Sequence, residues 1–194
     1  MLTSNGYVLD ESDTRLAELE PVPPPSERGS RDTLWARLRH EGYLYLKGGQ
    51  LNPDQLLDFR EFYFASLGEA NVYAAGTDPR DGIAAPGDVD RGALRRGLFD
   101  HIVPGPEYQA LCTSQGIADW FAWFLGDDVH LHRRKIIRHT KPGGESGIGT
   151  ATQAHYDLVY LREGSDRVLS MWIPWAIARG SVAAWLTSRA ATTG

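Results

Sequence analysis

The hydrophobic residues of this chain follow two different periods, a helical one up to about residue 125 and a strand-like one after it. In a helix, residues three or four apart share a face, whereas in a strand residues two apart do. The helical spacing occurs in four places, and we expect a helix over each of the ranges 30–38, 53–67, 107–112 and 117–125.

The ends of these helices coincide with residues that favour helix termini. Ser30 and Asn52 are good N-terminal caps, and Pro53 follows Asn52 in the first turn, where its missing N–H costs nothing. Gly42 and Gly126 are placed to end the first and the last helix. The terminal residues therefore support the helices independently of the hydrophobic period.

Beyond the last helix, three segments alternate as strands do, over residues 129–139, 152–161 and 168–174. A short strand is also expected over residues 43–46, and residues 69–92 show no period and are expected to form a long loop. Helices first and strands afterwards favour an α+β arrangement, in which helices brace one side of a sheet sandwich.

Neither end of the chain continues these patterns. Residues 1–29 are polar and proline-rich, and they predict an extended lead-in with little regular structure. Residues 175–194 show neither strand alternation nor a helical stripe and are rich in Ala, Arg, Ser, Thr and Gly. We therefore divide the chain into the lead-in, one domain over residues 30–174 and an aberrant tail.

Composition limits the class of protein. A length of 194 residues suits one domain, and 42% hydrophobic with 23% charged residues is typical of a globular chain. A net charge of −5 without a long basic run argues against a nucleic-acid partner, and no apolar stretch is long enough to span a membrane. The single cysteine, Cys112, cannot form an internal disulfide, so a cytoplasmic location is expected.

The segment over residues 152–161 carries a metal-binding pattern. His155 and Asp157 are two residues apart, so they project from the same face of a strand, together with Gln153. Two imidazoles and one carboxylate form the ligand set of non-haem Fe(II) oxygenases. His155 is the last histidine of the chain, so no later residue supplies the second imidazole. The plainer interpretation of the pair alone is a histidine hydrogen-bonded to a neighbouring carboxylate, without metal.

The order of these motifs resembles the phytanoyl-CoA dioxygenase family. Residues 41–48, Glu-Gly-Tyr-Leu-Tyr-Leu-Lys-Gly, and residues 51–54, Leu-Asn-Pro-Asp, are similar to the N-terminal part of that family. Residues 131–144 lead into the segment 153–157, and the strand expected over 169–174 follows at the spacing of the family. The resemblance covers most of the chain, from about residue 40 to about residue 174.

This resemblance implies a double-stranded β-helix, a jelly-roll or cupin-like fold, braced by N-terminal helices and lacking its C-terminal half. It implies Fe(II), 2-oxoglutarate as cosubstrate, and hydroxylation of a small organic substrate with release of succinate and CO2. His155 and Asp157 match the first two iron ligands, and Ile137, Gln153 and Trp172 match positions at the 2-oxoglutarate site. Related halogenases lack a carboxylate where Asp157 stands, so the resemblance favours hydroxylation or desaturation over halogenation here.

The similarity ends after residue 174. Family members continue with a polar turn, a glycine-rich segment, a strand bearing the second iron histidine, and an arginine that pairs with 2-oxoglutarate, and residues 175–194 show none of these. Permitted codons for residues 175–179 encode Gly-Asp-Cys-Pro in another frame, which is similar to the turn of the family. We therefore expect that the tail is read out of frame, and that the chain has little or no dioxygenase turnover.

Other interpretations remain open. The main alternative is a non-catalytic relative that serves as a ligand-binding or regulatory module, and a sugar- or lipid-binding jelly roll would leave the His-x-Asp spacing unexplained. The sequence identifies neither the substrate nor the oligomeric state. Several further residues invite a functional interpretation but are more simply read as solvated surface residues, namely His130, His132, His139, Lys135, Arg95 and Arg96.

Overall fold

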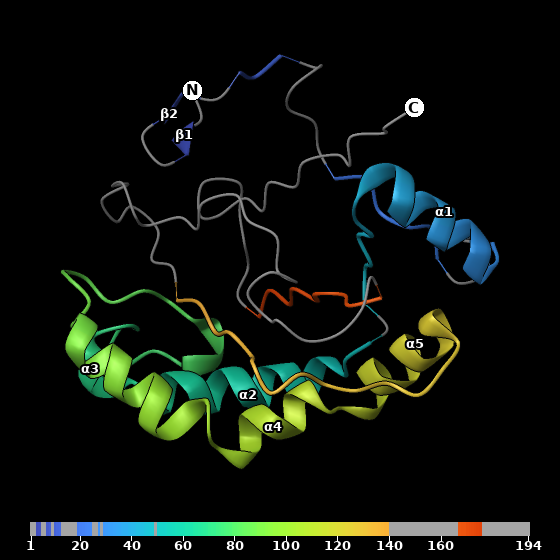
Figure 1. The fold of residues 1–194 in the computed structure, drawn as a ribbon. Helices are drawn as coiled ribbons and strands as arrows, with labels where there is room; N and C mark the ends of the chain where they lie inside the picture. Colours follow the sequence, from blue (N-terminus) through green and yellow to red (C-terminus); the bar gives the residue numbers. More distant parts are fainter. Residues whose placement is uncertain are drawn as a thin grey trace. The chain divides into compact units, whose positions relative to one another are not determined.

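The chain divides into two compact units. The computed structural model describes residues 3–4, 7–8, 10–12, 19–24, 27, 29–48, 50–139 and 167–175 (Figure 1). The first unit comprises residues 1–47, 143–170 and 185–194, and the second comprises residues 48–142 and 171–184.

The first unit contains the helix α1 (Arg31–Glu41). It begins at Ser30, whose hydroxyl oxygen accepts a hydrogen bond from the backbone N–H of Thr33 at 3.3 Å. It ends at Gly42, which has a φ of 80° and so adopts the left-handed conformation that glycine tolerates best. Leu34 is the buried residue of the helix. Both predicted ends of this helix are confirmed.

The lead-in of the first unit contains a short antiparallel pair, β1 (Thr3–Ser4) with β2 (Tyr7–Val8). Further along, the carbonyls of Glu20 and Pro21 accept hydrogen bonds from the guanidinium of Arg37, at 2.7 and 3.2 Å. Arg37 belongs to α1, so these bonds attach the lead-in to the helix.

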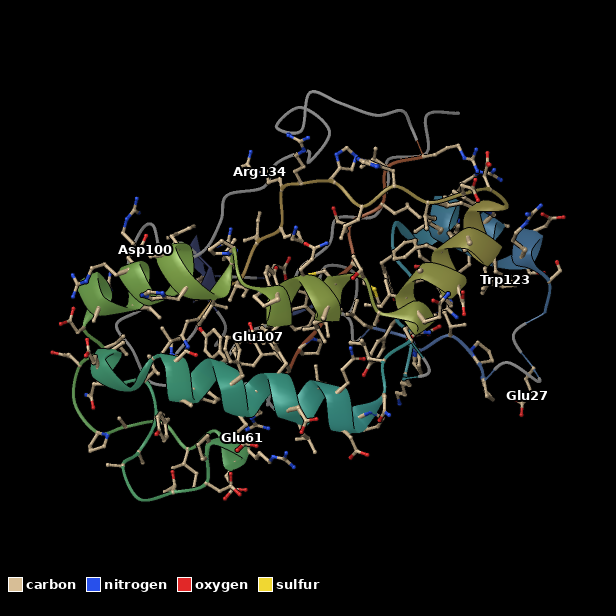
Figure 2. The ribbon with its side chains drawn as sticks, turned by 90° about the horizontal axis from the view of Figure 1, so that it is seen from below. Glu27, Glu61, Asp100, Glu107, Trp123 and Arg134 are labelled. Carbon is tan, nitrogen blue, oxygen red and sulfur yellow. The ribbon has the colours of Figure 1, made fainter. Side chains whose placement is uncertain are left out.

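The second unit is helical. Its α2 carries three of the largest buried side chains of the unit, Phe59, Tyr63 and Phe64, and lies beside α4 (Figures 1 and 2). Its helices are α2 (Pro53–Ser66), α3 (Arg91–Arg96), α4 (Pro106–Cys112) and α5 (Gln115–Leu125), with 3-10 turns η1 (Gly68–Ala70) and η2 (Pro79–Asp81) and a π-helical turn η3 (Gly97–Ile102). The buried core residues are Phe59, Tyr63, Phe64, Leu67, Ala70, Val72, Ala93, Leu98, Ile102, Tyr108 and Leu111.

The predicted start of α2 and the predicted end of α5 are confirmed, although α5 begins two residues earlier than predicted. The side-chain oxygen of Asn52 accepts a hydrogen bond from the N–H of Asp54 at 2.9 Å, and Pro53 stands in the first turn of α2. Gly126 ends α5 with a φ of 72°. Near the start of α5, Gly116 is so close to Gln50 that a Cβ there would lie 2.4 Å from its carbonyl oxygen, which explains the glycine.

Residues 71–89 form the expected loop, and its two ends meet. The N–H of Asp90 donates to the carbonyl of Ala70 at 3.0 Å. Asn71, with a φ of 55°, donates from its side-chain amide to the carbonyls of Pro86 and Asp88, at 3.0 and 2.9 Å. A compact surface loop closed in this way is an Ω-loop, although at this length it is longer than most.

Charged side chains attach the loop to α2. Arg80 in η2 pairs with Asp58 at 2.6 Å and with Glu61 at 2.7 Å, both on the exposed side of α2 (Figure 2 labels Glu61). Arg60, also on α2, is buried and donates to the carbonyl of Asp81. The loop is therefore held along the helix rather than extending into solvent.

The predicted α+β double-stranded β-helix is wrong. Apart from β1, β2 and an isolated bridge between Pro21 and Tyr45, the regular structure of the described residues is helical. The strands expected over residues 129–139 and 168–174 are extended chain without strand pairing where the structure describes them. The strand expected over residues 152–161 lies outside the described residues.

The physical reason is that alternation makes a segment able to form a strand, whereas a sheet also needs partners for the backbone N–H and C=O groups. Part of the segment 129–139 turns one set of side chains toward the helices instead, and the helices bury what a sheet would otherwise bury. None of the described helices is long and apolar enough to cross a membrane.

Candidate functional site

The residues predicted for the iron and cosubstrate site fall into two groups. Gln153, His155 and Asp157 lie outside the described residues, so the structure does not place them. Ile137 is half-buried and packs against the core cluster of the second unit. Trp172 is exposed over 47% of its surface. Their roles at a 2-oxoglutarate site stay predictions.

Residues 134–139 nevertheless alternate as a strand does. The half-buried residues are Lys135, Ile137 and His139, and the exposed ones are Arg134, Ile136 and Arg138 (Arg134 is labelled in Figure 2). The half-buried set faces the helices. Burial raises the pKa of the Cys112 thiol, and the charge of Lys135 nearby offsets part of that rise. The shared face predicted for Lys135 and Ile137 is confirmed, and it is the face that covers the helical core.

Tyr63 on α2 is the point where two distant segments meet. Its side chain is fully buried, and its hydroxyl oxygen lies 3.2 Å from Nδ1 of His139. The two rings also stack, with centroids 6.1 Å apart and planes 15° from parallel. Trp175 contacts the same tyrosine edge-on, at a centroid distance of 4.1 Å. The side chain of Tyr63 therefore contacts both His139, at the end of the segment 129–139, and Trp175, the residue after 174.

Burial determines the protonation state of the Tyr63 phenol. Removal from water raises the pKa of the Tyr63 phenol above its ordinary value of 10.0, so the phenol keeps its proton at neutral pH. The protonated phenol and Nδ1 of His139 share a hydrogen bond whose direction is set by the tautomer of the imidazole. Because Tyr63 has no exposed surface, its contacts with His139 and Trp175 hold chain segments in place.

No candidate metal centre is found in the part of the chain that the structure describes, since no three His, Cys, Asp or Glu side chains gather there. His130 and His132, which share a face by parity, have ring centroids 5.8 Å apart with the planes inclined by 71°. Two imidazoles without a third ligand make a poor site for a divalent ion. His130 is exposed and His132 is half-buried. The same surface interpretation is wrong for His139, which is half-buried and lies against the buried Tyr63.

Sequence reasoning missed two features of this cluster. Helical spacing placed Tyr63 in the core, but its hydrogen-bond partner is 76 residues away, and nothing local indicates the pairing. Trp175, which the sequence division leaves in the tail, packs on Phe59 and Phe64 as well as on Tyr63. The sequence contained one signal that Trp175 belongs to the core, namely its large apolar side chain directly after the last alternating segment.

Comparison with known proteins adds no relative: no family model, no curated protein and no solved structure matches the chain. The resemblance to the phytanoyl-CoA dioxygenase family therefore rests on the motifs and on their order.

Proposed function

We propose that this chain represents an Fe(II)/2-oxoglutarate dioxygenase with weak activity or none, and that His155 and Asp157 bind its metal ion. The observation that carries the proposal is the His-x-Asp spacing, set among motifs in the order of the family. An imidazole and a carboxylate two residues apart share a face wherever the chain is extended, and both donor types suit Fe(II). The substrate would be a small organic molecule.

The residues of the chain fit the metal only in part. His155 and Asp157 supply one imidazole and one carboxylate of the usual set of two imidazoles and one carboxylate. The described residues do not gather a cluster that replaces it. Two protein ligands bind a divalent ion more weakly than three, so weak metal binding is expected.

A metal titration tests the proposal. Co(II) is the probe, because it takes nitrogen and oxygen ligands, has a visible spectrum and is stable in air. We expect weak binding that His155→Ala and Asp157→Ala both abolish, whereas His40→Ala, a change at an exposed histidine of α1, leaves it unchanged. Binding that persists in His155→Ala at the affinity of the unmodified chain would refute the assignment.

A turnover assay separates the metal site from the activity. With Fe(II), ascorbate and 2-oxoglutarate, we expect less succinate than one molecule per chain. More succinate than that would contradict the expected inactivity while supporting the family. Absence of metal binding, together with a second frame that encodes no histidine-bearing segment, would favour the non-catalytic alternative. The nucleotide sequence after codon 174 is the test of the reading-frame hypothesis, which fails if the other frame encodes no histidine-bearing segment.

A further inference from the structure

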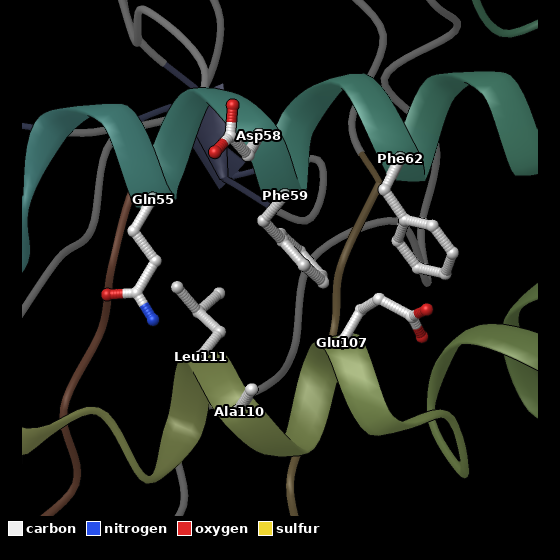
Figure 3. A pocket seen from close by; sticks show the side chains of 7 residues that line it. All are labelled: Gln55, Asp58, Phe59, Phe62, Glu107, Ala110 and Leu111. Atoms are coloured by element: carbon white, nitrogen blue, oxygen red, sulfur yellow. The ribbon is translucent and has the colours of Figure 1, made fainter.

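A hollow of about 170 Å³ lies between α2 and α4 (Figure 3). Its floor is apolar: Phe59 and Leu111 are buried, and Phe62 is half-buried beside them. The rings of Phe59 and Phe62 both line the hollow, with centroids 6.1 Å apart and planes inclined by 43°. The small side chain of Ala110 on α4 leaves the hollow open to solvent.

The rim of the hollow is polar and acidic. Glu107 from α4 reaches toward Phe62 at one end, and Gln55 from α2 lies at the other (Figure 3). Asp58 also lines the hollow, but its carboxylate pairs with Arg80. In the described part of the chain no ion pair joins Glu107 to a cation. No lysine, arginine or histidine belongs to the lining.

We propose that this hollow binds a small organic cation, an ammonium or guanidinium group carried on an apolar body of about six to eight carbon atoms. A cation is attracted to the faces of aromatic rings and to the unpaired carboxylate of Glu107, and each contact at an exposed site strengthens binding about two- to fivefold. The volume suits one ring, because a cavity of about 150 Å³ accommodates benzene.

The lining argues against other occupants of the same size. An anion would be placed beside Glu107 and Asp58 and would find no positive side chain. A neutral apolar molecule would fill the floor but would cover part of the Glu107 carboxylate without replacing its water. The inference is independent of the metal proposal, because no residue of the hollow is a predicted iron or cosubstrate ligand.

The test uses benzylammonium as the probe, with benzyl alcohol as the neutral analogue and benzoate as the anionic one. Binding is followed on the full chain by the chemical shifts of backbone amides in α2 and α4. We expect benzylammonium to bind at least about fivefold more tightly than benzyl alcohol, since the charged contacts are absent from the alcohol. We expect benzoate not to bind.

Three variants locate the site. Glu107→Gln should bring the affinity for benzylammonium to within about twofold of that for benzyl alcohol, because it removes the charge and keeps the shape. Ala110→Leu should weaken both by at least about tenfold by filling an exposed part of the hollow. Glu69→Gln, at an exposed carboxylate outside the lining, should change neither.

Far-UV circular dichroism shows whether each variant is folded. Should Ala110→Leu not fold, Glu107→Gln alone carries the comparison, because residue 107 is exposed. The proposal is overturned if benzyl alcohol binds as tightly as benzylammonium, if Glu107→Gln leaves the preference for the cation intact, or if benzylammonium shifts no amide of α2 or α4.

Discussion

Tyr63→Phe is expected to destabilise the second unit through a single lost hydrogen bond. The substitution removes only the hydroxyl, which lies 3.2 Å from Nδ1 of His139, and leaves the ring among its aromatic neighbours. Phenylalanine fills nearly the same volume, so no cavity forms. The change in the free energy of unfolding therefore reports the contact between α2 and the end of the segment 129–139.

The structure sets the size of this effect. A neutral hydrogen bond contributes about 0.5–1.5 kcal/mol to stability, and leaving a buried partner unsatisfied costs more. Tyr63 is fully buried, but His139 is half-buried, so water can reach Nδ1 and recover part of the loss. We expect a decrease of about 1 kcal/mol. Tyr63→Ala also removes the ring and its aromatic contacts, and should cost about 3–5 kcal/mol.

Urea unfolding followed by circular dichroism at 222 nm measures both changes, and a double-mutant cycle with His139→Ala isolates the contact. A coupling energy of about 1 kcal/mol is expected between positions 63 and 139. Tyr73→Phe is the matched control, because Tyr73 is half-buried beside the same core and its hydroxyl makes no hydrogen bond to the residues that the structure describes. If the two substitutions at 63 and 139 add to within about 0.3 kcal/mol, the contact contributes nothing and the reasoning fails.

Three further outcomes follow from the same structure. Burial raises the pKa of the Tyr63 and Tyr108 phenols above 10.0, so above about pH 10 the folded chain keeps protons that the unfolded chain releases. The contribution of these phenols to the free energy of unfolding is therefore full below about pH 10 and declines above it. Urea titrations at about pH 8 and about pH 11 should show that decline, and Tyr63→Phe should reduce it; equal stability at both values would contradict it. Gly116→Ala should cost about 1–3 kcal/mol because its Cβ meets a backbone carbonyl, whereas Gly68→Ala, with open space around it, should be nearly neutral in thermal unfolding. Asn52→Ala should cost about 1 kcal/mol through loss of the α2 cap, and an unchanged urea midpoint would contradict this role.

The helices could be predicted from the sequence because their signals are local. Ser30 and Asn52 accept hydrogen bonds from N–H groups two or three residues away, and Gly42 and Gly126 need only their own positive φ. Such features depend on a few consecutive residues, so they survive an error in the overall fold. This is why the four predicted helices are found although the predicted fold class is wrong, while the helical residues of α3 and η3 were not predicted.

The attachment of the loop 71–89 could not be predicted in the same way. Its ties run between positions about 15 to 22 residues apart, as from Asn71 to Pro86 and from Arg80 to Asp58, and no local period records them. Arg60 makes the same point, because an arginine on a helix is ordinarily exposed and this one is buried against Asp81. The pattern behind the candidate metal site is local, because it consists of two residues on one strand face. A complete ligand set also needs a third residue from a distant part of the chain, which a local pattern does not identify.

The segment 129–139 shows why strand-like alternation did not lead to a sheet. A period of two says that one side of an extended segment is apolar and is buried, but it does not name the surface that buries it. Here Ile137 packs on the helical core and His139 on Tyr63, while Ile136 remains exposed over 63% of its surface. The helices therefore bury the apolar side of this segment, which a sheet would otherwise have buried. The side-chain pattern along the segment is the same in both cases. What differs is the backbone, since its N–H and C=O groups need a second extended segment at hydrogen-bond distance. Alternation therefore predicts which residues of a segment are buried, and it predicts a sheet only when a partner for the backbone is identified as well.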